Sequence, residues 1–289
     1  MQHLSRWLIG AVLIAGLAGI GYLWWQKQQP PALAPIAEAP AVTPPVATPE
    51  TMAQAPEAAA SEPANYPIEA IAPAPGASAA LPPIVAEDDN AVRDAVTELL
   101  GREQALSFLD LSDFARRIVA TVDNLARGHA ASRLWPVAPA PARFLVVEKD
   151  GVEYIAGGNG ERYNAFVRFV TAIDSDAAVA LYVRMYPLLQ KAYEDLGYPG
   201  KYFNNRLVEV IDQLLQTPEP SEPIQVTLMR VKGPIAEKRP WIRYEYADPT
   251  LEARPAGQKI MLRMGLRNTA ALKAKLRDLR KRVAGRTIN

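Results

Sequence analysis

The distribution of apolar and polar residues divides the chain into three parts. Residues 7–25 are uniformly apolar, residues 26–86 show neither a helical nor a strand period, and residues 87–289 show both periods in turn. In the third part, two runs repeat apolar residues every three or four positions and end at a glycine, as amphipathic helices do. These runs are Val92, Val96 and Leu99 before Gly101, and Phe114, Ile118, Val122 and Leu125 before Gly128.

Two segments are rich in β-branched and aromatic residues. The first, residues 143–157, has Asp150-Gly151 at its centre and predicts a β-hairpin. The second comprises residues 223–231 and 239–248, which we expect to form a second small strand pair. Alternation would then place Ile224, Val226 and Leu228 on one face of the first strand, and Ile242, Tyr244 and Tyr246 on one face of the other.

Helical periods return in four further segments. They are residues 161–173, a segment from Asp174 or Ser175 to Gly197, residues 202–216, and a last helix after Asn268 that is buried through Leu272, Leu276, Leu279 and Val283. Because helices outnumber strands and the strands are short, residues 87–289 predict a single globular domain of helix-rich α+β class.

A glycine-rich stretch, Gly157-Gly158-Asn159-Gly160, follows the predicted hairpin and precedes a helix. Such loops can cradle phosphates at a helix N-terminus. The glycine spacing fits neither common phosphate-binding motif, and no lysine follows. We therefore expect a hairpin exit in which Asn159 caps the next helix.

The stretch "YPLLQKAYEDLGYPG", residues 186–200, combines aromatic, acidic and turn-forming residues. On a helix, Tyr182, Tyr186 and Tyr193 border the apolar arc, which predicts buried rings with hydroxyls directed to water. Pro187 predicts a kink or a restart of the helix. These tyrosines, and a groove beside Pro187, are one candidate binding surface.

The composition excludes several kinds of chemistry. The chain has no cysteine and only two histidines, His3 and His129, so thiolate chemistry and histidine-rich zinc sites are excluded. We expect neither a cofactor nor a metal ion. An enzyme would have to use carboxylates, Tyr, Lys or Arg, and the alternative function is a carboxylate-based enzyme that acts on cell-wall glycan. The nominal candidates are Glu153, Glu161, Glu194 and Glu245, although surface charge explains each of them equally well.

Charge is unevenly distributed along the chain. The net charge is +1, but residues 254–289 carry eleven Lys and Arg against Asp278 alone. One hypothesis is that this basic C-terminal helix binds an anionic polymer or a lipid surface; nucleic acid is not expected as a partner. The alternative, which we favour, is a solvated face whose late cations suit the helix dipole. The candidate binding residues here are Lys273, Arg277, Arg280 and Lys281.

The apolar residues 7–25 predict a transmembrane anchor. Nineteen residues at 1.5 Å each span about 28 Å, close to the thickness of a hydrocarbon core. Aromatic residues mark both interfaces, as in a membrane belt: Trp7 at one end, and Tyr22, Trp24 and Trp25 at the other. A cleaved signal peptide is the alternative, but proline follows its best cleavage site, residues 32–34.

Basic residues predict the orientation of this anchor. Arg6 and the amino terminus precede the span, and after Lys27 no Lys or Arg occurs before Arg93. Residues 1–6 are therefore expected in the cytoplasm, with the anchor in the bacterial inner membrane and residues 87–289 in the periplasm. The Ala- and Pro-rich residues 26–86 predict a disordered spacer. Small residues four apart, Ala15 and Gly19, are compatible with dimerisation.

The order of several motifs resembles a known family. "RLWPVAP", "ERY", "YPLLQKAYEDLGYP", "LVEVIDQLL" and "YEYADPTLEARPAGQKIMLRMG" follow one another as in the bacterial family called domain of unknown function 3014. The resemblance in sequence covers residues 110–284. Members of the family also resemble this chain in layout, with an N-terminal anchor and a Pro- and Ala-rich spacer. The resemblance implies no activity or catalytic residue. The long spacer, the missing cysteine, the scarce histidine and the absence of a catalytic motif favour a non-enzymatic envelope interaction or scaffold module, whose partner is an envelope protein or the cell wall.

Overall fold

The computed structural model describes residues 63–71, 82–84, 89–229 and 242–285, all of which belong to one compact unit, Pro56–Asn289. Within these ranges, none of the helices combines the length and the apolar character that a membrane span requires. The predicted anchor, residues 7–25, lies outside the described residues, as does most of the predicted spacer.

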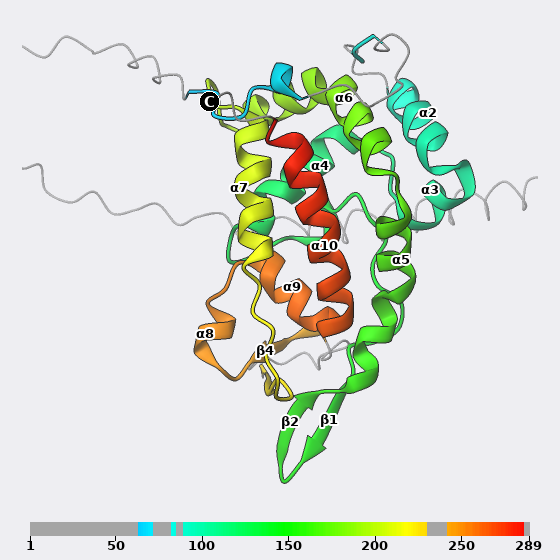
Figure 1. Cartoon of the computed structure of the whole chain (residues 1–289). Coiled ribbons are helices and arrows are strands. Elements are labelled where there is room, and N and C mark those ends of the chain that lie inside the picture. The colour runs from blue at the N-terminus through cyan, green and yellow to red at the C-terminus, as the bar shows by residue number, and fades with distance from the viewer. Residues whose placement is uncertain (1–62, 72–81, 85–88, 230–241, 286–289) are drawn as a thin grey trace, which may run out of the picture. The chain divides into compact units, whose positions relative to one another are not determined.

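Helices form most of the domain, and α10 has several of them as neighbours. It packs against α5, α6, α7 and α9, as Figure 1 shows. The helices are α2 (Asp89–Leu100), α3 (Arg102–Phe108), α4 (Phe114–Leu125), α5 (Asn164–Ala172), α6 (Ser175–Asp195), α7 (Phe203–Leu215), α8 (Pro249–Glu252), α9 (Ala256–Met264) and α10 (Leu266–Val283), with short 3-10 helices η1 (Ile68–Ala70), η2 (Ser132–Leu134) and η3 (Gly157–Tyr163). The predicted helix-rich α+β class is confirmed.

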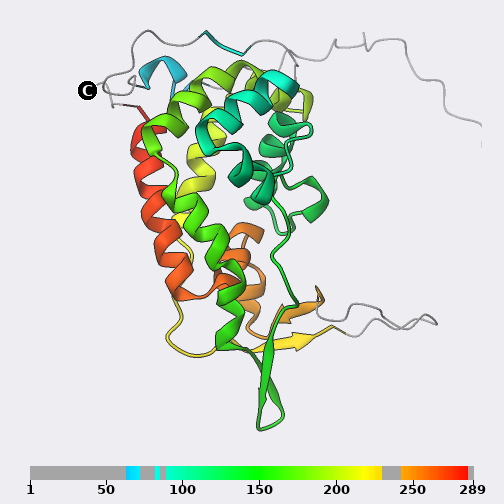
Figure 2. The same cartoon turned by 90° about the vertical axis from the view of Figure 1, so that its right-hand side faces the viewer.

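Two antiparallel strand pairs complete the domain. The first joins β1 (Val146–Lys149) to β2 (Val152–Ile155), and the second joins β3 (Val226–Leu228) to β4 (Tyr244–Tyr246). The turn between β1 and β2 has positive φ at Asp150 and Gly151, as its sequence predicts. The pairs meet where the Ile155 N–H donates to the Ile224 carbonyl over 2.9 Å. Figure 2 shows the hairpin projecting beyond the helices.

Asn159, in the glycine-rich stretch, does not cap α5, contrary to the prediction. It is fully buried in η3, and its Oδ1 accepts from the Leu145 N–H over 3.1 Å. Its Nδ2 donates to the Arg263 carbonyl over 2.7 Å. Asn159 therefore ties the hairpin to α9, and a buried tertiary hydrogen-bond network takes the place of a local cap.

The core consists of two main apolar clusters that meet at α6. One cluster centres on Phe203 and Leu189 and includes α2, α3 and α4; the other centres on Val208 and includes Val283 at the end of α10. Tyr182 packs against both clusters. The two clusters together fix α6 and α7 relative to the rest of the domain.

α6 continues without interruption through Pro187, so the predicted restart at this proline is wrong. Asp174 caps the helix as predicted, accepting from the Ala177 N–H over 2.8 Å. Pro187 lacks an N–H and crowds the preceding turn. In that turn, the carbonyl of Arg184 accepts a 2.8 Å hydrogen bond from the Ile84 N–H. Residues 82–84 therefore contact α6 one turn before Pro187.

Two pieces of the predicted spacer are packed onto the domain. Residues 63–71 include η1 and bury Ile71, which is 9% exposed, and residues 82–84 bury Ile84 in the first cluster. The ordered unit therefore begins before residue 87, because these segments bury apolar side chains that the composition of the spacer concealed.

Candidate functional site

A groove of about 630 Å³ lies at the turn between α6 and α7. The C-terminal part of α4 forms its floor, and residues 65–66 form part of its wall. Its lining is mostly polar, with four tyrosines. The lining residues are Asn65, Tyr66, Asp123, Tyr193, Tyr198, Lys201, Tyr202, Asn205, Arg206, Glu209, Asp212, Gln213 and Gln216.

Asp123 forms the charged floor of the groove. This α4 carboxylate is 2% exposed and lies 2.6 Å from Nη2 of Arg127 and 3.0 Å from Nη2 of Arg206. The Tyr198 hydroxyl donates to it over 3.2 Å. The charge of Asp123 raises the pKa of Arg127. A buried charge with this many donors is compensated, so Asp123 holds the floor in place.

Stacked rings form the aromatic side of the groove. Tyr193, near the end of α6, stacks on Tyr198 with ring centroids 4.5 Å apart, and its ring also contacts Phe203. Lys201 lies over the outer ring, with Nζ 6.0 Å from the centroid of Tyr198. Tyr202 is 39% exposed at the rim. The sequence "GYPG" is thus a helix stop, as predicted, and also supplies an aromatic surface.

The other two predicted tyrosines lie outside this groove. The Tyr182 hydroxyl donates over 2.9 Å to Oδ1 of Asn204, which is fully buried. Burial raises the pKa of Tyr182 well above its usual value. Tyr186 donates to Gln190 over 3.1 Å and makes an edge contact with Tyr182. The hydroxyl of Tyr182 is directed into the domain. The sequence predicted that it would face water, and for this residue that prediction is wrong.

The basic residues predicted on α10 contact other parts of the domain. Lys273 is 6% exposed, and its Nζ donates over 2.6 Å both to the Thr217 carbonyl and to Glu219. Arg280 forms a two-pronged ion pair with Asp212 on α7. The cations of α10 therefore hold neighbouring segments against the helix.

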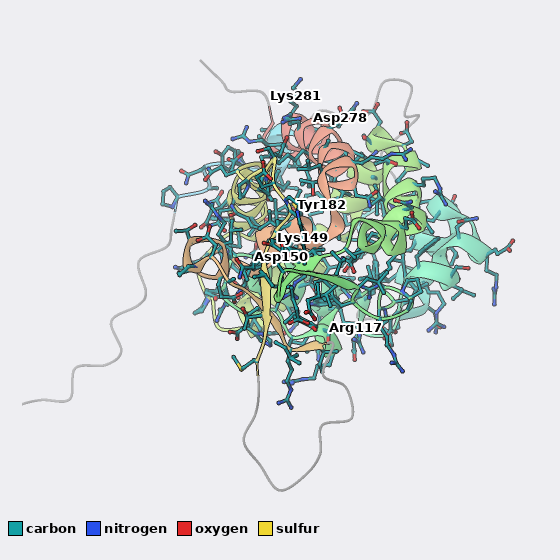
Figure 3. The ribbon with its side chains drawn as sticks, turned by 90° about the horizontal axis from the view of Figure 1, so that it is seen from below. Arg117, Lys149, Asp150, Tyr182, Asp278 and Lys281 are labelled. Atoms are coloured by element: carbon teal, nitrogen blue, oxygen red, sulfur yellow. The ribbon has the colours of Figure 1, made fainter. Side chains whose placement is uncertain are left out.

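Two of the predicted basic residues, Arg277 and Lys281, have exposed side chains. Figure 3 shows Lys281 projecting from α10 near the edge of the domain. Asp278 lies between them along the helix and pairs with Arg282, which also pairs with Asp176 on α6. Acidic residues thus interrupt the basic face, and the four predicted cations do not form one continuous surface.

The four nominal catalytic carboxylates are distributed over separate elements. Glu153 on β2 accepts from the Tyr244 hydroxyl over 2.7 Å, and Glu194 on α6 accepts from Gln190 over 2.8 Å. Glu161 lies in η3 and Glu245 on β4. Burial, followed by Glu153, raises the pKa of Tyr244 to about 12. Within the described part of the chain, no group of His and acidic residues could hold a metal ion.

Sequence reasoning missed Asp123, Tyr198 and Arg206, which form the floor of the groove. One local signal was available: Asp123 lies four residues after the buried Val119, on the inward side of α4. Its partner Arg127 follows after one more helical turn. Arg206 is 83 residues away in sequence, and no local pattern places it beside Asp123.

Comparison with known proteins identifies a family for this domain. The profile of the family described as "Protein of unknown function (DUF3014)" matches residues 114–280, from the start of α4 into α10. No curated protein and no solved structure matches the chain. The matched range contains Asp123, Tyr193, Tyr198 and Arg206, whereas Tyr66 precedes it. The match covers more than half of the 289 residues, and the chain belongs to the DUF3014 family.

Proposed function

We propose that this protein is a membrane-anchored, non-enzymatic interaction module, displayed in the periplasm. The apolar residues 7–25 would anchor it in the inner membrane, with residues 1–6 in the cytoplasm. The Ala- and Pro-rich residues 26–62 would form the tether. Fully extended as polyproline II, these 37 residues would reach about 115 Å, so the domain could contact partners well away from the bilayer.

The groove at the α6–α7 turn is the observation that carries the proposal. It combines stacked rings with amide, carboxylate and cationic side chains, a lining that suits recognition of a polar partner. Its most buried charge, Asp123, is engaged by two guanidinium groups and a hydroxyl. A general acid or base has to reach its substrate, and a carboxylate held in this way supports binding geometry better than proton transfer.

Membrane topology can be tested with a reporter enzyme that is active only outside the cytoplasm. Fused after Asn289, it should be active in intact cells, and deletion of residues 7–25 should abolish that activity. A reporter that functions only in the cytoplasm should be inactive at the same position. If that second reporter is the active one, the proposed orientation is wrong.

Partner binding can be tested by photo-crosslinking from the groove. A photoreactive residue in place of Tyr202, at the exposed rim, should capture an envelope protein or wall glycan in intact cells. The matched control is the same residue in place of Val147, which is 51% exposed on β1 and outside the groove. Identical products from both positions, or no product from position 202, would contradict a role for the groove.

A further inference from the structure

Residues 63–71, here called the strap, are bound by two side chains of α7. Nδ2 of Asn205 donates to the Pro63 carbonyl over 2.9 Å, and Oδ1 of Asn205 accepts from the Tyr66 N–H over 3.1 Å. One amide thus pairs with two backbone groups three residues apart. Such pairing resembles the recognition of a peptide ligand through its main chain.

The neighbouring Asn204 extends this recognition into the core. Its Nδ2 donates to the Tyr66 carbonyl over 2.8 Å and to the Val283 carbonyl over 3.0 Å. Its Oδ1 accepts from the Tyr182 hydroxyl. Release of the strap would leave one Nδ2 hydrogen of this fully buried side chain without its partner, whereas the bonds to Tyr182 and Val283 do not involve the strap.

Apolar contacts hold the C-terminal half of the strap. Ile68 and Ile71 pack into the second core cluster with Val208 and Val283. Ala70 lies so close to Gly285 that a Cβ added at Gly285 would be 3.0 Å from the Ala70 Cβ. The strap therefore packs closely against α6, α7 and the end of α10.

The strap also completes the groove. Asn65 and Tyr66 line its wall, and Asn205, which holds the strap, lines it too. A partner that contacts these strap residues binds the docked state more tightly than the released state. By linkage, strap docking and partner binding then favour each other.

The chain after the strap has its own, separate attachment to the domain, at residues 82–84. Ile84 belongs to the first apolar cluster, and its N–H donates to the Arg184 carbonyl. The strap's isoleucines belong to the second cluster. Release of residues 63–71 therefore leaves residues 82–84 and α2 in place, as local opening of a small unit requires.

We propose that the strap is a detachable intramolecular ligand that couples tension in the tether to the groove. Tension from the membrane side reaches Pro63 before any other described residue, so it acts first on the bond to Asn205. Docked, the strap completes the groove; released, it removes Asn65 and Tyr66 from the wall. The source of tension rests on the proposed function, whereas the detachable docking does not.

The absence of native cysteine allows a direct test in the full chain. Ile71→Cys places one thiol on the buried side of the docked strap itself, and Ala105→Cys, at a fully buried position on α3, reports opening of the main core. Adding Asn205→Ala should accelerate thiol labelling at position 71 by about tenfold. Labelling at position 105 should not change, and the groove variant Gln216→Ala should leave both rates unchanged.

Equal acceleration at positions 71 and 105, or none at position 71, would overturn the proposal. Ala70→Cys repeats the measurement with a smaller change of side chain. The coupling is tested by crosslinking from position 202, where Asn205→Ala should lower the yield at least several-fold. Retained yield in this variant refutes the coupling alone, whereas no product from the otherwise wild-type chain refutes the proposed function.

Discussion

Nη2 of Arg206 on α7 lies 3.0 Å from the carboxylate of Asp123 on α4, which is 2% exposed. The same carboxylate forms an ion pair with Arg127 and accepts a hydrogen bond from the Tyr198 hydroxyl. One buried charge therefore links the end of α4, the α6–α7 turn and the start of α7, and the groove has this linkage as its floor.

We expect Asp123→Asn to lower the free energy of unfolding by about 3 kcal/mol. The amide keeps the size of the side chain but removes the buried charge that Arg127 and Arg206 share, and Arg206 retains only its 2.8 Å pair with the exposed Glu209. Breaking a buried ion pair is costly. Urea unfolding measures the change. The matched control is Asp195→Asn, which breaks a 2.8 Å pair with Lys191 whose side chains are 50% and 56% exposed. That change should stay below about 0.5 kcal/mol, and equal effects would show that the buried linkage has no special weight.

The sequence predicted the longer helices because most of them pack an apolar stripe against the domain. In α10 the predicted stripe is only partly buried: Val283 is buried, whereas Leu272, Leu276 and Leu279 are half-buried. α4 and α7 follow their apolar periods closely. α3 was missed because its seven residues bury only Ala105, too little for a periodic pattern. Gly101 ends α2 as expected, but its positive φ also allows the next helix to begin at once.

What the sequence could not predict depends on partners far along the chain. The strap is held by Asn204 and Asn205, more than 130 residues away, so its composition alone indicated disorder. The last helix was predicted from its apolar period, but acids on other segments, such as Asp212 and Glu219, determine which of its cations stay exposed. Local patterns contain no information on these non-local pairings.

The hydrogen bond between Tyr182 and Asn204 should show strong energetic coupling. Asn204→Ala leaves the carbonyls of Tyr66 and Val283 unpaired, and we expect a loss of about 3 kcal/mol in unfolding free energy. Tyr182→Phe should lose about 1 kcal/mol. Because the residues share a bond, the double variant should lose at least about 0.5 kcal/mol less than the sum of the single losses. Denaturant titration of all four proteins checks this, and simple additivity would contradict it.

Lys273 and Lys281, on the same helix, should respond differently to substitution. Lys273→Met removes the buried hydrogen bond to the Thr217 carbonyl, and we expect the free energy of unfolding to fall by about 2 kcal/mol. Lys281→Met, at an exposed position, should change stability by less than about 0.5 kcal/mol. Thermal unfolding at matched ionic strength compares the two. Similar small effects would indicate that Lys273 is a surface cation, as a ligand-binding role would require.

Alkaline pH should destabilise the domain through its tyrosines. Burial and then Glu153 raise the pKa of Tyr244 to about 12, against about 10 in the unfolded chain. A raised folded pKa stabilises the fold fully below pH 10, and this contribution is lost as pH rises from about 10 through about 12. Tyr182 and Tyr246 act in the same direction, because burial raises the pKa of each.

Glu153→Gln isolates the contribution of the carboxylate to this shift. Without the nearby negative charge, the pKa of Tyr244 should fall but remain above 10, because burial is the larger cause. Tyrosinate absorbance during a pH titration follows the change, with Tyr244→Phe identifying the signal. Glu98→Gln, an exposed change on α2, is the control and should leave the titration unaltered. An unchanged titration in Glu153→Gln would refute the assigned contact.

The glycine-rich stretch offers a last, closely matched comparison. A Cβ added at Gly160 would lie 2.8 Å from the Met264 carbonyl oxygen, whereas one at Gly158 meets nothing within 4 Å. Gly160→Ala must shift the backbone between η3 and α9, and we expect a loss of about 2 kcal/mol. Gly158→Ala should be neutral or stabilise the domain by up to about 1 kcal/mol, since it restricts only the unfolded chain. Chemical unfolding measures both variants. Two equal losses would mean that close packing is not what requires glycine here, and would reopen the interpretation of the stretch as a ligand-binding loop.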